Sequence, residues 1–411
     1  MNLDGIKITK TQYVILFLFL FLWLYIRASP HQILSFIQTH YLFNYEHEFL
    51  KRGFVGEVLR LSVKNLNADI VYNLSLFFLI FLSIIFFKIF FIDFNKDTNT
   101  NKLIFSTMVF VSPLTLQHFI FEIGRFDIIN ILITLLCFFI VEKFYKNTFL
   151  VVILIFPLLC CMLLIHEASF LMFIPMIFGF WFFKNSKKYT FGIQAILFLI
   201  IIFITYKIST LGLSTKYTYT EYYNLLVNKY FIFADDLASG RFFSVRSTAV
   251  ETMYRDLFNT YDPNVLYPIF EETMRMSFNI KWLANNLILI ILLSPVFLII
   301  FTIYRSFFKV SDLKTKLFLI TPLSPFALFI LGYDHMRWWA IIFTNIFIIL
   351  FRLSKEKDIY LEIILANIKK YKILYIFLIL ESFVLGPVKF MSTFDIIENL
   401  DSYSKFFNNE N

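Results

Sequence analysis

Three short polar clusters interrupt otherwise apolar stretches of this chain, at residues 122–127, 166–167 and 333–338. They contain Arg, His, Glu and Asp, the side chains that transfer protons and bind phosphate or carboxylate groups. Ionisable groups are costly at membrane depth and usually mark a functional site there. We therefore expect chemistry or transport at these clusters, if the apolar stretches around them cross a membrane.

The composition predicts an integral membrane protein. Of 411 residues, 59% are hydrophobic and 57 are Phe, and the charged residues fall between the apolar runs. A spanning helix takes about 20 apolar residues. The chain offers about eleven such runs, at 12–27, 70–92, 103–121, 128–142, 149–165, 170–183, 190–208, 284–304, 317–332, 339–351 and 373–387. We predict an all-α, polytopic transmembrane helical bundle that forms a single integral membrane domain over residues 1–411.

The lysines predict the orientation, because Lys and Arg in short loops stay cytoplasmic. They recur in alternate loops, at 7–10, 96–102, 143–146, 184–188, 305–316 and 352–372. This series places the amino terminus inside, the carboxyl terminus outside, and all three polar clusters on the outer face. Residues 149–183 could form a helical hairpin or one span with a re-entrant piece. Lysines on both flanks favour the hairpin.

Arg125 and Arg337 lie in outer turns of about six residues, where positive charge opposes the orientation rule. The planar fork of arginine suits bidentate contact with phosphate. Asp127 and Asp334 lie close in sequence, so a structural ion pair explains each arginine equally well. Both interpretations, diphosphate binding and ion pairing, stay open at this stage.

His166 and Glu167 are the sharpest candidates for acid–base chemistry. Either could deprotonate a hydroxyl if burial or a neighbour tunes its pKa. Adjacent residues on a helix point about 100° apart, so we expect no contact between them, with one side chain facing a cavity and the other pairing with an arginine. The alternative is a helix-capping Glu beside a core His.

Two outer segments could bind substrate. The first outer loop, residues 27–69, mixes apolar and charged residues over 45–60, which predicts an interfacial amphipathic helix broken at Gly53. Such a helix could offer Glu46, Glu48 or Arg52 to a lipid-linked substrate, or it could be an ordinary surface helix with solvated charges.

The large outer loop, residues 209–283, holds many tyrosines together with Arg241, Arg246 and Arg255. Aromatic faces and forked donors suit sugar recognition, although a folded cap without a ligand would also use them. The length of this loop favours a lid or binding element over a passive connection.

Other chemistries fit less well. Cys137, Cys160 and Cys161 fall inside predicted spans, so neither disulfides nor a thiolate metal site is indicated. No nucleotide-binding glycine loop is present. The formal net charge of +8 comes mostly from the inner lysines, which favours anionic membrane lipids over nucleic acid as partners. We expect no cofactor and no metal.

A Phe-, Ile- and Leu-rich chain of this length, with one large outer loop and outer Arg, His and Glu, resembles the Wzy-type polymerases of O-antigen and capsule repeat units. The resemblance implies transfer of an undecaprenyl-diphosphate-linked glycan onto a lipid-linked repeat unit at the periplasmic face of the bacterial inner membrane. It implies that Arg125 and Arg337 bind diphosphate and that His166 or Glu167 activates the acceptor, with Arg241, Arg246 and Arg255 as rival arginines. It also implies chain-length regulator and flippase proteins as partners. The further substrate-binding candidates are Asp127, Asp334, His335, Glu46, Glu48, Arg52, Arg241 and Arg246.

Two alternatives remain. The GT-C class of polyprenyl-phosphate-sugar glycosyltransferases places acidic residues in the first outer loop, which Glu46 and Glu48 match loosely. The chain lacks the Asp-containing pair near the end of the first helix and the soluble carboxyl-terminal domain of that class. A lipid-linked oligosaccharide flippase would carry charges along a path through the bilayer, whereas here they gather at one face.

Overall fold

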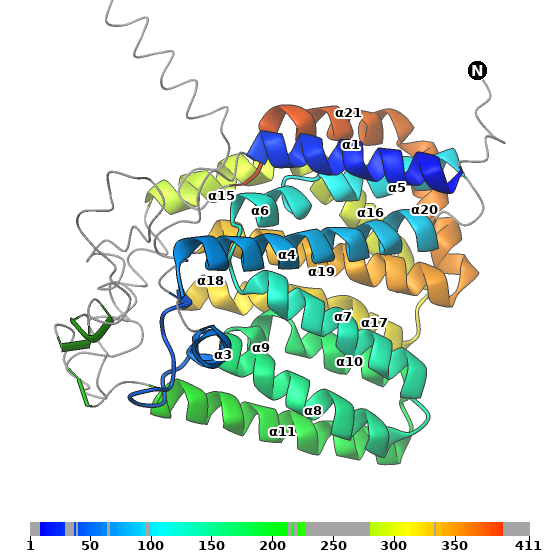
Figure 1. Ribbon diagram of the computed structural model, residues 1–411. Helices are drawn as coiled ribbons and strands as arrows, with labels where there is room; N and C mark the ends of the chain where they lie inside the picture. The colour runs from blue at the N-terminus through cyan, green and yellow to red at the C-terminus, as the bar shows by residue number, and fades with distance from the viewer. Residues whose placement is uncertain are drawn as a thin grey trace, which may run out of the picture. The chain divides into compact units, whose positions relative to one another are not determined.

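The computed structural model is helical throughout the residues that it describes, and no strand occurs among them (Figure 1). The all-α prediction is therefore confirmed. The described residues are 9–28, 37, 40–63, 66–94, 99–212, 216–217, 221–222, 224–226, 280–332 and 334–388. Most of the predicted large outer loop, with Arg241, Arg246 and Arg255, lies outside this set, and so does Tyr333.

Within the described residues, 7 helices are long and apolar enough to cross a membrane, or 8 if one bent pair counts as a single span. The chain is thus a multi-span membrane protein by helix length and composition, while the predicted number of about eleven spans is not confirmed. The candidate spans are α1 (Lys10–Ala28), α4 (Ala68–Phe87) with the π-helix η1 (Lys88–Asp93), α5 (Thr100–Val111) with α6 (Leu116–Phe121), α8 (Thr148–Ile165), α11 (Lys188–Leu211), α17 (Leu313–Ile320) with η3 (Thr321–Ala327) and α18 (Leu328–Leu331), and α19 (His335–Glu356).

The remaining predicted runs are helical, but they depart from the span criteria. The helices α15 (Ile280–Leu292) and α16 (Ser294–Val310) are bent by 70° at the break between them. The helices α10 (Ile174–Lys184) and α21 (Lys372–Leu385) contain 11 and 14 residues, fewer than the roughly 20 that a straight span needs. The helix α7 (Asp127–Phe144) is long enough, yet it carries Asp127, Glu142 and Lys143.

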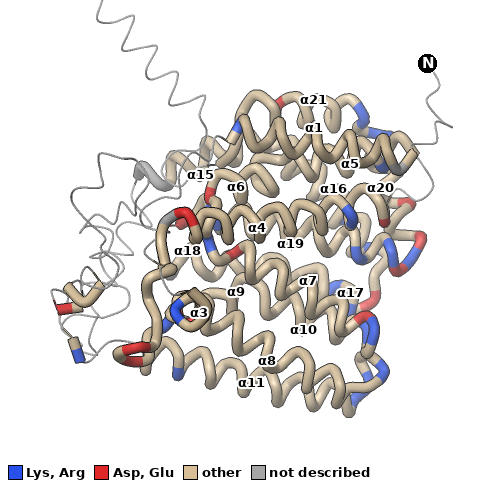
Figure 2. Tube along the Cα trace, viewed as in Figure 1, with Lys and Arg blue, Asp and Glu red and all other residues tan. Residues whose placement is uncertain are grey.

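The chain divides into two compact units, which we describe separately. Unit 1 comprises Met1–Pro30, Ile80–Glu122 and Met274–Asn411, and unit 2 comprises His31–Leu79 and Ile123–Thr273. The expectation of a single integral membrane domain stays a prediction. In both units the charged positions gather near the ends of helices, and the long middle stretches are uncharged (Figure 2).

The centre of unit 1 is α19, which is buried along nearly its whole length. A helix that is buried all round belongs to a protein core. It packs against η3, α15, α18 and α20 (Asp358–Lys370). Near its carboxyl end, the ring of Phe351 lies 4.4 Å from that of Phe90 and 4.6 Å from that of Phe94. Aromatic packing therefore joins the end of α4 and η1 to α19.

Unit 2 is built around α7, which packs against both α8 and α10. The chain turns at His166–Ala168, passes through the short α9 (Ser169–Met172) and returns as α10. At the end of the return, Asn185 donates a hydrogen bond to the carbonyl of Tyr145 at 2.7 Å, just before α8 begins. The two ends of residues 149–183 therefore meet, and the hairpin that crosses the membrane twice stays a prediction because its second arm is short.

Of the amphipathic helix predicted over residues 45–60, the structure contains only the part after Gly53. The helix α3 (Phe54–Ser62) begins directly after Gly53, with Val55 and Leu59 buried and Leu61 exposed. Residues 45–52 form turns instead of a helix. Arg52 adopts a left-handed backbone conformation, with a φ of 65°, which interrupts any right-handed helix. The amide of Glu46 also binds the side chain of Asn44 at 3.0 Å, a local bond that competes with helix formation.

The chain segment before these turns crosses α3 at Gly56. A Cβ at this position would lie 1.9 Å from the carbonyl oxygen of Phe43 and 2.8 Å from that of Tyr41. No side chain fits at such a distance, so only glycine allows the loop backbone to lie on the helix.

We predict that Gly56→Ala lowers the free energy of unfolding by about 1–3 kcal/mol or more, because the added methyl group displaces the backbone at Phe43. Denaturation in mixed detergent micelles measures the change. The matched control is Gly192→Ala in α11, where an added Cβ meets nothing within 4 Å; it should leave stability unchanged or raise it by about 0.5–1 kcal/mol. Equal stability of both variants would contradict the close approach at Gly56.

Candidate functional site

The site in unit 2 is organised by an ion pair between the first outer loop and the α8–α9 turn. Arg52 Nε lies 3.1 Å from Oε1 and 2.9 Å from Oε2 of Glu167, and Arg52 Nη2 donates to Oε1 at 2.5 Å. The side chains are only 13% and 16% exposed. A forked contact of this kind is directional as well as charged, so it fixes the two turns against each other.

Glu167 is held in its ionised form. Burial alone would raise the pKa of its carboxyl, but the charge of Arg52 above all, with those of Lys51 and of His166 whenever it is protonated, holds the pKa well below its usual range. Lys51 Nζ lies 3.9 Å from Oε1. A carboxylate with a depressed pKa is a weak proton acceptor, which makes Glu167 a poor general base at neutral pH. It suits a role in orienting and stabilising a neighbouring cation.

Arg52 reaches Glu167 from a strained backbone position. It is the one residue other than glycine with a positive φ in the described part of the chain. Such conformations cost roughly 1–3 kcal/mol and persist where surrounding contacts over-determine them. Here the amide of Lys51 binds the carbonyl of Gly212 at 3.0 Å, and the amide of Gly53 binds that of Leu50 at 3.1 Å. These bonds hold the turn that directs Arg52 toward the α8–α9 turn.

His166 ends α8 and lies against Glu167, contrary to our expectation. Its Nδ1 is 3.6 Å from Oε2 of Glu167, and its side chain is 7% exposed. We expected no contact because adjacent helical residues diverge, but α8 stops at Ile165 and His166 has an extended backbone. The amide of Ala168 donates to Nδ1 at 3.2 Å. The imidazole nitrogen therefore has two competing partners, an amide donor and an ionised carboxylate.

The turn before α7 holds Arg125 and Asp127 in unit 2, both of them buried. Asp127 is the first residue of α7, where the helix dipole favours a negative charge. Gly124 has a φ of 95°, which glycine adopts without strain. Its carbonyl accepts a hydrogen bond from the Tyr41 hydroxyl at 2.6 Å. The segment that contains Tyr41 and Arg52 therefore contacts this turn as well as the α8–α9 turn.

Asn130 is a site residue that the sequence analysis missed. It is fully buried in α7, and its Nδ2 donates to the hydroxyl of Ser169 at 2.7 Å, next to the α8–α9 turn. Its Oδ1 is buried and accepts no hydrogen bond from the described residues. The signal was present, since an Asn in an apolar run needs a polar partner, but the partner lies 39 residues away.

The third polar cluster belongs to unit 1. Arg337 Nη1 lies 3.2 Å from Oδ2 of Asp334, so the ion pair that the sequence suggested is present. His335 Nδ1 lies 2.8 Å from Nδ2 of Asn286 on α15, and the Oδ1 of Asn286 accepts from Trp339 Nε1 at 2.8 Å. Asn286 was not foreseen. It determines the tautomer of His335, because its amide nitrogen donates and leaves Nδ1 as the acceptor.

Two of the other predicted substrate-binding residues, Glu46 and Glu48, lie in the turns before Arg52. Glu46 is exposed, and its Oε2 lies 4.0 Å from Nε2 of His47. Glu48 is half-buried in the same turns before Arg52. Arg241 and Arg246 lie outside the described residues. In the part of the chain that the structure describes, no group of His, Cys, Asp and Glu has the arrangement of a metal site.

No family model matches the chain, and no curated protein and no solved structure matches it. Function is therefore argued from the chemistry of the site alone.

The Arg52–Glu167 pair predicts how stability depends on pH. Because the folded-state pKa of Glu167 lies below its unfolded value of 4.5, its contribution is complete above that pH and is lost as the pH falls through the folded pKa. We expect the Tm of the wild type to fall below about pH 4.5. At neutral pH, Glu167→Gln should lower the free energy of unfolding by about 3 kcal/mol, since it leaves a buried arginine without its anion. Its Tm should fall less steeply than that of the wild type as the pH is lowered.

The control is Glu57→Gln, which removes the carboxylate of the Glu57–Arg60 pair within α3. The arginine of this pair is 29% exposed, whereas Arg52 is 13% exposed. At neutral pH this substitution should lower the free energy of unfolding by about 0–1 kcal/mol. A Tm profile of Glu167→Gln that parallels the wild type from pH 7 to pH 3 would show that Glu167 has an ordinary pKa.

Proposed function

We propose that this chain is a membrane glycosyltransferase that polymerises undecaprenyl-diphosphate-linked repeat units of a surface polysaccharide at the periplasmic face of the bacterial inner membrane. The observation that carries the proposal is the arrangement in unit 2, where an ionised Glu167, held by the Arg52 fork, lies beside the imidazole of His166. A general base and an anion that stabilises it once protonated are groups that such a transfer requires, and the same unit contains the buried Arg125 as a candidate ligand of the leaving diphosphate.

In the proposed reaction, His166 removes the proton from an acceptor sugar hydroxyl. The hydroxyl oxygen forms a bond to the anomeric carbon of the donor, the bond from that carbon to the phosphate oxygen breaks, and its electron pair leaves with the lipid diphosphate. The proton remains on the imidazole until it returns to solvent or to the leaving group. No nucleotide is needed, because the donor is already activated.

The contacts of His166 suggest how it could become a base. While Nδ1 accepts the Ala168 amide, the neutral ring carries its proton on Nε2 and has no free lone pair there. If Nδ1 instead carries the proton and turns it toward Glu167, Nε2 becomes the acceptor. A shift of a few tenths of an ångström converts 3.6 Å into a hydrogen bond. Substrate binding that closes this gap would activate the base.

The arginines have separate proposed roles. Arg52 directs its fork to Glu167, so we propose it as a positioning residue. Arg125, buried at the start of α7, is the proposed diphosphate ligand of unit 2. Arg337 is the proposed diphosphate ligand of unit 1, with Asp334 orienting its guanidinium. A planar guanidinium matches the oxygens of a leaving diphosphate as their charge grows.

We predict that His166→Ala lowers the rate of polymerisation by about 10²–10⁴-fold, because the base is lost while binding groups remain. The measurement is the ladder of surface glycan on a gel, in a deletion strain that expresses each variant to equal levels. The control is His47→Ala, whose half-buried imidazole lies outside the proposed machinery; it should restore the full ladder.

The deletion strain itself separates the alternatives. Glycan limited to a single repeat unit supports polymerisation. Complete loss of the glycan would point to an earlier transferase of the GT-C class or to a flippase, and an unchanged ladder would rule out all three functions.

We predict that Arg337→Lys loses most of the polymerising activity although the charge is kept, because a point charge does not reproduce the fork. Arg305→Lys, at an exposed position of α16, is the matched control and should keep full activity. Polymer of wild-type length from Arg337→Lys would remove Arg337 from the mechanism.

A further inference from the structure

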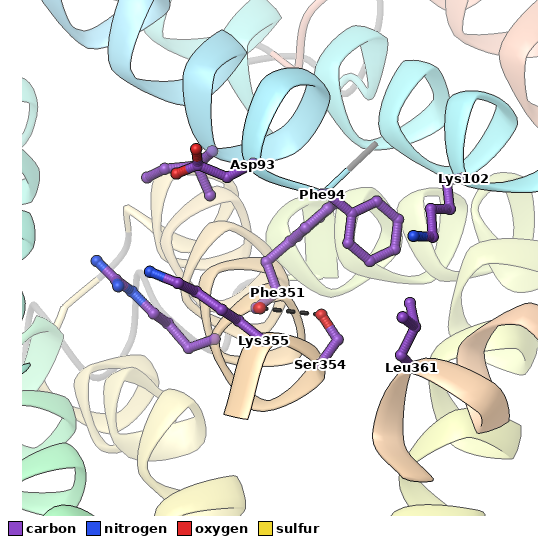
Figure 3. A pocket seen from close by; sticks show the side chains of 9 residues that line it. Asp93, Phe94, Lys102, Phe351, Ser354, Lys355 and Leu361 are labelled. Atoms are coloured by element: carbon purple, nitrogen blue, oxygen red, sulfur yellow. Dashed lines mark hydrogen bonds between the residues drawn. The ribbon is translucent and has the colours of Figure 1, made fainter. Parts of the chain in front are cut away.

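Unit 1 contains a cavity of about 150 Å³ that no step of the proposed transfer uses. It lies where the end of α4 and η1, the start of α5, the end of α19 and α20 come together (Figure 3). Its walls include Asp93, Phe94, Lys102, Phe351, Arg352 and Lys355. On the predicted orientation this end of unit 1 faces the cytosol, because the connections here carry lysines.

The charge of the cavity is positive. Lys102, Arg352 and Lys355 line it from α5 and α19, and Asp93 is the one carboxylate among the lining residues that the structure describes. In Figure 3, Lys102 lies by the Phe94 ring on one side of the cavity and Lys355 lies on the other. Three cations against one anion around a small volume attract a ligand that carries more than one negative charge.

Lys102 is the unusual member of this group. Its side chain is buried, with only 4% exposed. Its Nζ lies 5.8 Å from the centre of the Phe94 ring. It also occupies the first turn of α5, where the helix dipole disfavours a cation. An anion in the adjoining cavity would add a favourable charge interaction with this cation.

The shape of the cavity depends on the π-helix η1. Segments of this kind are rare and often lie at functional sites. The hydroxyl of Ser106 on α5 binds the carbonyl of Phe90 in the middle of η1. The ring of Phe94, directly after η1, meets that of Phe351 edge to face with centroids 4.6 Å apart and lies 6.0 Å from that of Phe105. Two of the lining residues, Phe94 and Phe351, are thus packed against each other.

We propose that this cavity binds a phosphate-bearing anion. The guanidinium of Arg352 and the ammonium groups of Lys102 and Lys355 are the donors that phosphate oxygens take. The volume corresponds to about five water molecules, enough for a phosphate or a diphosphate group but too little for a sugar chain. The ligand is either a free phosphate compound or the headgroup of an anionic lipid. The proposal does not depend on the proposed glycan transfer.

The test compares two double variants that remove the same charge. Arg352→Gln with Lys355→Gln empties the cavity of two cations. Arg305→Gln with Lys309→Gln removes an exposed Arg and Lys of α16, in the same unit and in the same lysine-rich series. The full chain is placed in phosphatidylcholine nanodiscs, and the Tm is recorded with sodium pyrophosphate against sodium chloride of equal ionic strength. A parallel set uses nanodiscs with one fifth phosphatidylglycerol and no added phosphate.

At a concentration ten times Kd, we expect pyrophosphate or phosphatidylglycerol to raise the Tm of the wild type and of the α16 variant by roughly 1–3 °C. The cavity variant should show no shift. A response to pyrophosphate identifies a free phosphate ligand, and a response to phosphatidylglycerol alone identifies a lipid headgroup. If the cavity variant responds as the wild type does, or if the wild type responds to neither probe, the proposal is overturned.

A second variant guards against a general loss of folding in the first. Lys102→Met keeps the apolar stem and removes the charge, so the packing against Phe94 is retained. It should raise the Kd at least tenfold for whichever of the two probes, pyrophosphate or phosphatidylglycerol, binds the wild type. Its Tm without that probe should stay close to the Tm of the wild type. An unchanged Kd would exclude Lys102 and, with it, the proposed site.

Discussion

The site in unit 2 depends on the buried ion pair between Arg52 and Glu167. Each partner lies in a turn between helices, Arg52 before α3 and Glu167 between α8 and α9. Removing one partner would leave the other as an uncompensated buried charge, which costs about 3–5 kcal/mol. The pair therefore fixes the first outer loop on the α8–α9 turn, and it keeps an ionised carboxylate 3.6 Å from the imidazole of His166.

Close contacts between backbone segments surround this pair. Gly56 lets the segment at Tyr41 and Phe43 lie directly on α3, and the Tyr41 hydroxyl then binds the turn at Gly124. The helices themselves present apolar middles and place their charged residues at the ends, as the costs of membrane burial require. The ion pair and the hydrogen bonds of the candidate site in unit 2 thus lie in the turns between the helices.

Hydropathy alone predicted the helices and located the polar turns, because a long apolar run has few alternative structures. Its number of spans is not confirmed, since α10 and α21 are shorter than a straight span and α15 and α16 are bent at the break between them. The Asp334–Arg337 pair was predictable because its members are three residues apart. The partner of Glu167 was not, as it lies 115 residues away and reaches the site through a left-handed backbone at Arg52. Asn130 and Asn286 were missed for the same reason: their partners are distant in sequence.

The central claim is that Arg52 and Glu167 act as one unit that holds the α8–α9 turn. A double-mutant cycle of Arg52→Gln, Glu167→Gln and the double variant, read as the free energy of unfolding in mixed micelles at neutral pH, tests it most directly. We expect a coupling energy of about 2 kcal/mol or more, with the double variant more stable than the sum of the single losses implies. Single losses that add within about 0.5 kcal/mol would show that the two residues do not interact and would contradict the account.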